Sequence, residues 1–357
     1  MKIRRNEKCP CGSGVKYKNC CLGKADDPDY INPEKFKANF DVAVRKKMIK
    51  QCLHPIKEEC SEKIVKAHSL QNNRILNALA VNGHVITMQQ SVAFFMTGKE
   101  TGRKVATTFS GFCGYHDKKV FQPIEDQMFL ATEEQLFLYA YRAFAIELHK
   151  KMEQTKMFQH SFALKPSIVN SKDEHMLYYQ NLNIALDENA DIKAKFDKGL
   201  LNQEYNVLSH YIWELSEPID FAVSTTFEID YDLEGKQIND YRSPEPLKKI
   251  FITIFSKEEK SYFIFSWFKE NGGDYRRLTH QFDKLSSIEK KKYLNNLLVT
   301  YTENLVMSPR LWNRWGKDKQ EDYLAYFHMS SILPNWTDKQ SDLLSDTFFD
   351  LFERTSS

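Results

Sequence analysis

The sequence predicts an α+β protein with a small N-terminal zinc finger, a central zinc-containing α+β unit, and a C-terminal domain of helices around an antiparallel sheet. Three observations lead to this prediction. Four cysteines gather in the first 24 residues, three more lie with histidines over residues 52–125, and later segments alternate between helical and strand-like spacing of apolar residues. The expected boundaries are 1–24 for the finger, 25–51 for a linker and helix, 52–125 for the central unit and 126–357 for the mixed domain.

The N-terminal cysteines have the spacing of a metal site. They follow the pattern C-x-C-x8-C-C, so each pair can present two thiolates from one tight turn. The expected zinc ligands are Cys9, Cys11, Cys20 and Cys21. A peptide this short buries too little apolar surface to fold alone, so zinc would supply about 10 kcal/mol or more of its folding free energy. The alternative is a disulfide-bonded cap, which the expected reducing compartment disfavours.

The same run resembles the SEC-C motif, the zinc-binding tail of the preprotein translocase ATPase. The four cysteines fall on the family's ligand positions, as do Gly12, Ser13 and Gly14 on its glycine-rich turn, and the resemblance ends at about residue 23. It implies an adaptor that contacts a protein or the ribosome, and the many Lys and Arg residues of this segment suit an acidic partner. The alternative is that these residues only keep a small module soluble. ATPase activity is not expected, because the chain has no G-x-x-x-x-G-K-[ST] phosphate loop.

An acidic linker and a helix follow the finger. Residues 25–29 contain three aspartates and a proline, which is typical of a break. Asn32 is a suitable N-cap and Pro33 a suitable first helical residue, so we expect a helix over 32–51. Strands are then predicted over 64–68, 83–89 and 104–109, and the glycines and basic residues of 98–104 indicate an exposed turn between the last two.

A second set of metal-ligating residues lies in the central unit. Two cysteines occupy a loop and a C-x-x-H pair follows about fifty residues later, which together suit a structural zinc site. The expected ligands are Cys52, Cys60, Cys113 and His116, with His54 or His68 as substitutes. The alternative is a set of buried reduced cysteines with polar histidines nearby.

The layout of this unit resembles the treble-clef nucleases of the HNH class. A strand ends in His68 between the two zinc half-sites, and Asp117 directly follows the C-x-x-H pair. The resemblance implies that His68 is the general base and that Asp117 helps to hold Mg²⁺ or Mn²⁺ against a phosphate. The sequence departs from the family where Ala67 replaces the acidic residue before the histidine, and Asn77 and Asn82 are both candidates for the middle asparagine. A purely structural alternative makes His68 a zinc ligand in place of Cys52.

The C-terminal part of the chain predicts helices and an antiparallel meander. Apolar residues at helical spacing predict long helices over 132–157 and 172–201. Strands are expected over 221–227, 249–255 and 261–268, the last two forming a hairpin. Further helices are expected over 274–285, 287–307, 317–331 and 337–353. Residues 150–357 contain no recognisable catalytic motif.

Composition limits the classes of function. Lys and Arg number 50 against 48 Asp and Glu, so the net charge of +2 gives no overall attraction to nucleic acid, and any such surface must be local. No apolar run approaches about eighteen residues, so neither a membrane span nor a secretory signal is expected. Seven cysteines, an odd number, favour a reducing compartment, and we expect a cytoplasmic protein.

Two functions follow from these patterns. The first is a zinc-binding protein whose finger docks on a protein or ribosomal partner. The second is an HNH-like metal-dependent nuclease, a bacterial defence effector in one version, with His68 as its base and nucleic acid as its substrate.

Overall fold

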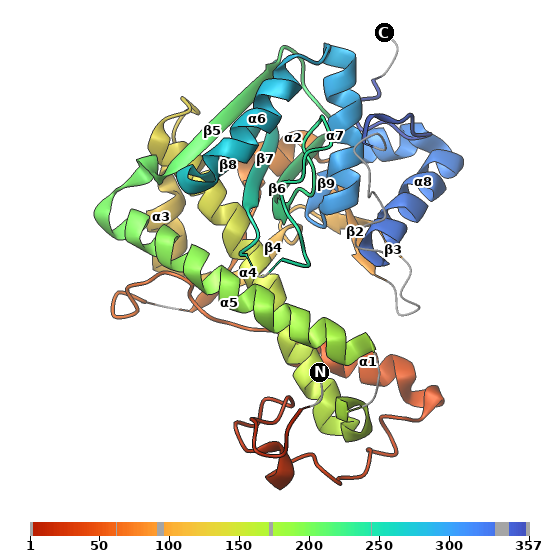
Figure 1. Cartoon of the computed structure of the whole chain (residues 1–357). Helices are drawn as coiled ribbons and strands as arrows, with labels where there is room; N and C mark the ends of the chain where they lie inside the picture. Colours follow the sequence, from red (N-terminus) through yellow and green to blue (C-terminus); the bar gives the residue numbers. More distant parts are fainter. Residues whose placement is uncertain are drawn as a thin grey trace. The chain divides into compact units, whose positions relative to one another are not determined.

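The computed structural model describes residues 3–61, 63–90, 96–170, 174–243, 245–332 and 343–354, and it confirms the mixed α+β class (Figure 1). The chain forms two compact units. Unit 1 comprises Met1–Gln51 and Glu147–Lys195, and unit 2 comprises Cys52–Ile146 and Phe196–Ser357. The long helices α4 (Glu133–Leu164) and α5 (Glu174–Asn202) contribute residues to both units. In the part of the chain that the structure describes, no helix has both the length and the apolar character needed to cross a membrane.

Unit 1 contains the N-terminal finger and the helical segments that pack around it. Its elements are the short helices η1 (Tyr17–Asn19), η2 (Pro33–Lys35) and η4 (Pro166–Asn170), helix α1 (Phe36–Lys47), and parts of α4 and α5. Asn32 caps η2 as predicted, because its side-chain oxygen accepts the Glu34 N–H at 2.9 Å. Cys9, Tyr17 and Cys21 are buried in one core with Phe162 and Met176, so this small module gains apolar packing that its own sequence does not provide.

Unit 2 is organised by a seven-stranded antiparallel sheet of order β3-β2-β9-β6-β7-β8-β5. Its strands are β2 (His84–Gln90), β3 (Met96–Gly102), β5 (Leu208–Leu215), β6 (Phe221–Glu228), β7 (Lys249–Lys257), β8 (Lys260–Phe268) and β9 (Leu305–Met307). A separate two-stranded antiparallel sheet pairs β1 (Ile64–His68) with β4 (Thr108–Cys113), and β2 and β3 lie between these strands in the chain. The large sheet thus takes strands from both sides of the predicted boundary at residues 125 and 126.

Both faces of the large sheet are covered. Alternate residues of β7 point to opposite faces, so Ile250, Ile252 and Ile254 join one apolar core, which also takes residues from α6 (Gly272–Asp283), α7 (Ser287–Tyr301) and α8 (Pro309–Ile332). On the other face, Phe251 contacts the rings of Phe144 and Phe196. A strand buried on both faces is apolar throughout rather than alternating, as the sequence of β7 is.

Two expectations at the sheet are wrong, because the structure has a strand where the sequence predicts a turn or a helix. Residues 98–102, expected in a turn, belong to β3, where Thr101 lies opposite Val85 of β2. The helix expected over 287–307 ends at Tyr301, and Leu305–Met307 form β9, whose three residues are buried between β2 and β6. At β9, pairing with β2 and β6, which lie far along the chain, overrides the local helical pattern, whereas β3 pairs with β2, the preceding strand. Of the helix expected over 337–353, residues 337–342 lie outside the described residues, and residues 343–354 form no α-helix and are mostly irregular.

Phe196 provides a test of the packing in unit 2. Its ring is fully buried against Phe137, Phe144 and Phe251, so Phe196→Ala should leave a cavity and lower the free energy of unfolding by about 3 to 5 kcal/mol. Urea unfolding followed by tryptophan fluorescence measures this, because all five tryptophans belong to unit 2. Phe348→Ala is the control, since 64% of that side chain is exposed and its loss should change stability little. Equal effects of the two substitutions would contradict the packing described here.

Candidate metal centres

The backbone of the finger brings its two cysteine pairs together. An antiparallel bridge between Lys8 and Lys16 closes the loop, and the Cys9 N–H donates to the Val15 carbonyl at 2.8 Å. Gly12 and Gly14 both have φ near +75°, with φ of 77° and 74°, a conformation that strains other residues. The turn after Cys9 and the short helix η1 before Cys20 therefore face each other across this loop.

The four sulfur atoms form a cluster with the dimensions of a tetrahedral zinc site. All four ligand atoms lie within 4.8 Å of one another. The Cys20 Sγ lies 3.5 Å from the Cys11 Sγ and 3.8 Å from the Cys21 Sγ. Zinc–sulfur bonds of about 2.3 Å place tetrahedral sulfurs about 3.8 Å apart, so the donor set and its spacing fit zinc. None of the seven cysteines forms a disulfide, so the disulfide-bonded alternative does not describe this structure.

Ionisation of the thiols is uneven within this cluster. Burial opposes ionisation of Cys11, but hydrogen bonds from the Ser13 side chain and backbone lower the pKa of its thiol to about 7. Burial raises the pKa of Cys9 and of Cys21 above the ordinary thiol value. One thiolate is thus readily available at neutral pH, and a metal ion must displace protons from the others, so binding should weaken as the pH falls.

A second cluster joins the two-stranded β1–β4 sheet to the loop that precedes β1. Strand β4 ends at Cys113, and helix α3 (Gly114–Glu125) begins directly after it, which places His116 in the first turn of the helix. The His116 Nδ1 lies 3.3 Å from the Cys113 Sγ and 3.5 Å from the sulfurs of both Cys52 and Cys60. Zinc–sulfur and zinc–nitrogen bonds of about 2.3 and 2.1 Å predict a separation of about 3.6 Å. The predicted CCCH ligand set therefore comes together and fits zinc.

Neighbouring side chains orient His116. Burial lowers the pKa of His116, which favours the neutral ring that a metal requires. Its Nε2 lies 3.7 Å from a carboxylate oxygen of Glu59, on the side away from the sulfurs. The ring of His54 stacks on the ring of His116, with centroids 3.7 Å apart. His54, one of the two proposed substitute ligands, therefore packs against the cluster and is not a member of it.

His68, the other proposed substitute, also lies outside both clusters. It is the last residue of β1, and its Nε2 lies 3.2 Å from the Arg103 carbonyl oxygen. Because a carbonyl only accepts, Nε2 carries the proton of the neutral ring and Nδ1 is left as the basic nitrogen. Burial lowers the pKa of His68 below its ordinary value, so the ring is neutral at pH 7.

Asp117 is influenced by the same two charged side chains, Glu125 and Arg142, that act on His68. Burial raises the pKa of Asp117, while the positive charge of Arg142 on α4 opposes that rise. Arg142 is buried, forms an ion pair with Glu125 at 2.5 Å, and lies over the Phe121 ring. The charges of Glu125 and Arg142 also act on His68. The buried cation Arg142 and the carboxylate of Glu125 therefore act on both His68 and Asp117, and buried groups with shifted pKa values are typical of functional sites.

Glu125 was not predicted as a functional residue, although the sequence contains an indication of its position. Asp117, Phe121 and Glu125 are spaced four residues apart, so they share one face of α3. That spacing points Glu125 toward the same neighbours as Asp117. It does not identify Arg142, because a lone arginine in a helix is usually exposed.

Comparison with known proteins identifies the finger. A family model of the SEC-C motif matches residues 5–23, which confirms the resemblance seen in the sequence. No curated protein and no solved structure matches the chain. The match covers the N-terminal cysteine cluster alone and says nothing about unit 2.

Replacing a ligand of the second cluster tests the metal assignment. If each cluster holds one zinc ion, Cys113→Ser should reduce the zinc content from two ions to one per chain, measured by elemental analysis of purified protein. His54→Ala is the matched control, because it removes the stacked ring and leaves every member of the cluster. Loss of zinc in His54→Ala, or retention of two ions in Cys113→Ser, would contradict this ligand set.

Proposed function

We propose that this zinc-binding protein uses its N-terminal finger to dock on an acidic surface of a protein or ribosomal partner. One observation supports the proposal above all others. Residues 3–24 carry six basic residues against the single acidic residue Glu7, a net charge of +5, and all six basic side chains are exposed. They are Arg4, Arg5, Lys8, Lys16, Lys18 and Lys24.

This charge exceeds what the metal site itself requires. A zinc ion held by four thiolates carries a charge of −2, and the six basic residues more than offset it. None of these side chains takes part in the ion pairs found among the described residues, so their positive charge remains directed to solvent. A rigid, exposed surface of one sign attracts a partner of the opposite sign and accelerates their association.

The conformation of this basic surface would depend on whether zinc occupies the cysteine cluster. The loop that carries Lys16 and Lys18 lies between the two cysteine pairs, so its conformation depends on the cluster. Loss of zinc should therefore disorder the docking surface as well as the metal site. The alternative, that these residues serve only solubility, predicts no such dependence.

Neutralising the surface tests docking. The triple variant Arg5→Gln, Lys16→Gln and Lys18→Gln should lose most cosedimentation with purified ribosomes at low salt, because contacts between these residues and phosphate groups are lost. The control replaces Lys104, Lys284 and Lys317, exposed lysines of unit 2, by Gln. Zinc content should stay unchanged in both variants. Failure of the unmodified chain to cosediment would argue against a ribosomal partner, and equal loss in both triple variants would argue against the finger.

We also propose a second function, an HNH-like nuclease in unit 2, because one further observation favours it. The zinc cluster is built from the loop before β1 and from the junction of β4 and α3, and His68 ends β1 outside that cluster. The position of His68 relative to the β1–β4 sheet and α3 therefore suits a catalytic role better than a ligand role.

His68, Asp117 and Arg142 have the chemistry needed for attack by water on a phosphodiester. The Nδ1 of His68 would accept the proton of the attacking water, since Nε2 is held by the Arg103 carbonyl. Asp117 would help to hold a divalent cation, with water and substrate phosphate as its remaining ligands, and such an ion would stabilise the developing negative charge. Arg142 would contribute positive charge close to the same phosphate.

Substitution of His68 tests this function. His68→Ala should lower magnesium- or manganese-dependent nicking of plasmid DNA or cleavage of RNA by about 10²- to 10⁴-fold, since a general base is lost, and should leave zinc content unchanged. His84→Ala, at an exposed position on β2, is the control. Because burial holds the pKa of His68 below 6.5, cleavage should persist at pH 6.5 and decline only at lower pH. Loss of zinc in His68→Ala would identify a ligand instead of a base.

A further inference from the structure

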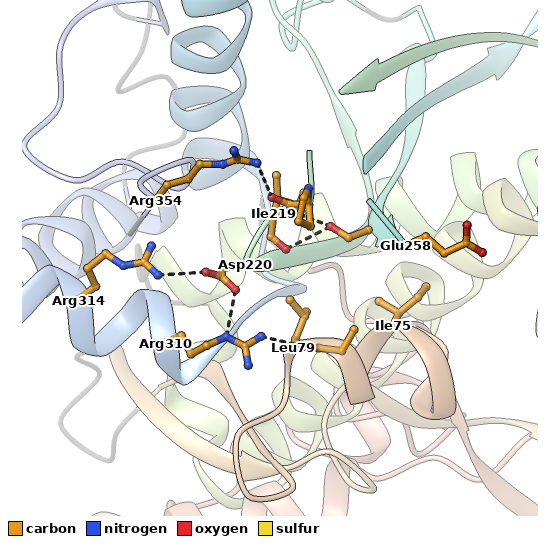
Figure 2. Close-up of a pocket in the computed structure, with 11 residues that line it drawn as sticks. Ile75, Leu79, Ile219, Asp220, Glu258, Arg310, Arg314 and Arg354 are labelled. Carbon is orange, nitrogen blue, oxygen red and sulfur yellow. Dashed lines mark hydrogen bonds and ion pairs between the residues drawn. The ribbon is translucent and has the colours of Figure 1, made fainter. Parts of the chain in front are cut away.

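Unit 2 contains a pocket that belongs to neither proposed function. Its cavity volume is about 400 Å³, within the range of small-molecule sites. Figure 2 shows three arginines at this pocket, two from α8 and one near the end of the chain, together with apolar side chains. None of the zinc ligands, His68 or Asp117 lines it, so its ligand is a separate question.

Backbone carbonyls orient all three guanidinium groups. Arg310 donates to the Ala78 carbonyl at 2.9 Å, Arg354 donates to the Pro218 carbonyl at 3.3 Å, and Arg314 donates to the Glu353 carbonyl. A carbonyl oxygen fixes the direction of a guanidinium group without cancelling its charge. The arginines are therefore held in place as cations before any ligand arrives, which lowers the entropic cost of binding.

The acidic residues at the pocket leave this charge incompletely balanced. Asp220 lies between the two α8 arginines, and its oxygens are 3.4 Å from the Arg310 Nε and from an Arg314 terminal nitrogen. Charge-assisted hydrogen bonds are usually about 2.7 to 2.9 Å long, so a single carboxylate pairs loosely with two cations. Figure 2 shows Glu258 on the other side of the pocket from Arg314.

Arg354 is also only partly neutralised. Its Nη1 lies 2.9 Å from Glu217, but the other oxygen of that carboxylate lies 2.6 Å from Lys291. Glu217 therefore serves two cations. Each carboxylate that contacts an arginine of the pocket is shared between two positive groups. With Glu258 counted, the three arginines and Lys291 still leave one surplus positive charge, which attracts an anion.

Apolar side chains line another part of the pocket, together with Ser256 and Glu258. Ile75 and Leu79 come from the segment after β1, and Ile219 comes from the residues before β6. All three side chains are buried, with exposed fractions of 8% or less. A ligand of the pocket therefore needs an anionic group at one side and an apolar or aromatic body at the other.

We propose that this pocket binds a small phosphate monoester with an aromatic or apolar body, a class that nucleoside monophosphates represent. Arginine presents paired N–H donors that match the oxygens of a phosphate. A phosphate monoester carries nearly two negative charges at neutral pH and three acceptor oxygens, enough to engage several guanidinium groups at once. A monocarboxylate would only repeat what Asp220 already supplies.

Calorimetric titration of the full-length chain with AMP and with UMP at low salt tests this proposal. The unmodified protein should bind them, and affinity should fall with added salt. Arg310→Gln, at a half-exposed arginine, should weaken binding about tenfold or more, because a charge-assisted hydrogen bond to phosphate is lost. Ala78→Phe, at an exposed residue of the lining, should also weaken binding by placing a ring in the pocket without removing a charge.

Controls separate the pocket from general charge and from folding. Arg276→Gln removes the same charge from an exposed position of α6 outside the pocket and should bind AMP as the unmodified chain does. Arg314 is only 18% exposed against 49% for Arg310, so Arg310→Gln and Ala78→Phe are the decisive variants, and their unfolding midpoints should lie close to that of the unmodified chain.

Three results would overturn the proposal. The first is no binding of nucleoside monophosphates at millimolar concentration, or equal affinity in Arg310→Gln and Arg276→Gln. The second is binding of inorganic phosphate as tightly as AMP, which would remove the role of the apolar side. The third is binding of a 5′-phosphorylated oligonucleotide but not AMP, which would assign the pocket to the end of a nucleic acid strand.

Discussion

The convergence of four ligand atoms at the end of β4 is the constraint on which the central part of unit 2 depends. A two-stranded sheet such as β1–β4 is marginally stable alone. The segment before β1 has no regular structure over residues 52–60. The cluster takes two ligands from that segment, one from the end of β4 and one from the first turn of α3, so it joins the loop, the two-stranded sheet and the helix at one point. This arrangement leaves His68 at the C-terminal end of β1, outside the set of four ligands.

Features set by local sequence were predictable, and features set by distant pairing were not. The cysteine spacings identified both clusters, although only the finger closes over a short loop, whereas the half-sites of the second cluster meet through the pairing of β1 with β4. The hairpin of β7 and β8 and the long helices α4 and α5 followed from periodicity. By contrast, β9 has three residues and exists because β2 and β6 provide pairing partners on both sides. The arginine pocket combines segments more than two hundred residues apart, for which the sequence offers no local signal.

Charge in this protein is segregated, although the whole chain is almost neutral. A net charge of +2 over 357 residues conceals a finger in which basic residues outnumber acidic ones six to one. It also conceals arginines at a pocket whose acidic neighbours are shared between cations. These two basic surfaces differ in kind. The finger exposes lysines and arginines to solvent and suits an extended partner, whereas the pocket holds oriented guanidinium groups suited to one small anion.

The pKa shifts of His68 and Asp117 affect the stability of the folded state, and a divalent cation at Asp117 would reduce that effect. Burial lowers the pKa of His68 and raises that of Asp117, so each shift disfavours a charged form. His68 therefore costs stability as the pH falls below its unfolded-state pKa, because the folded state resists its protonation. Asp117 costs stability above its own unfolded-state pKa, because the folded state resists its ionisation. At neutral pH only the carboxylate pays this cost. A cation bound to Asp117 would offset it, and ion binding and folding would then be coupled at this position.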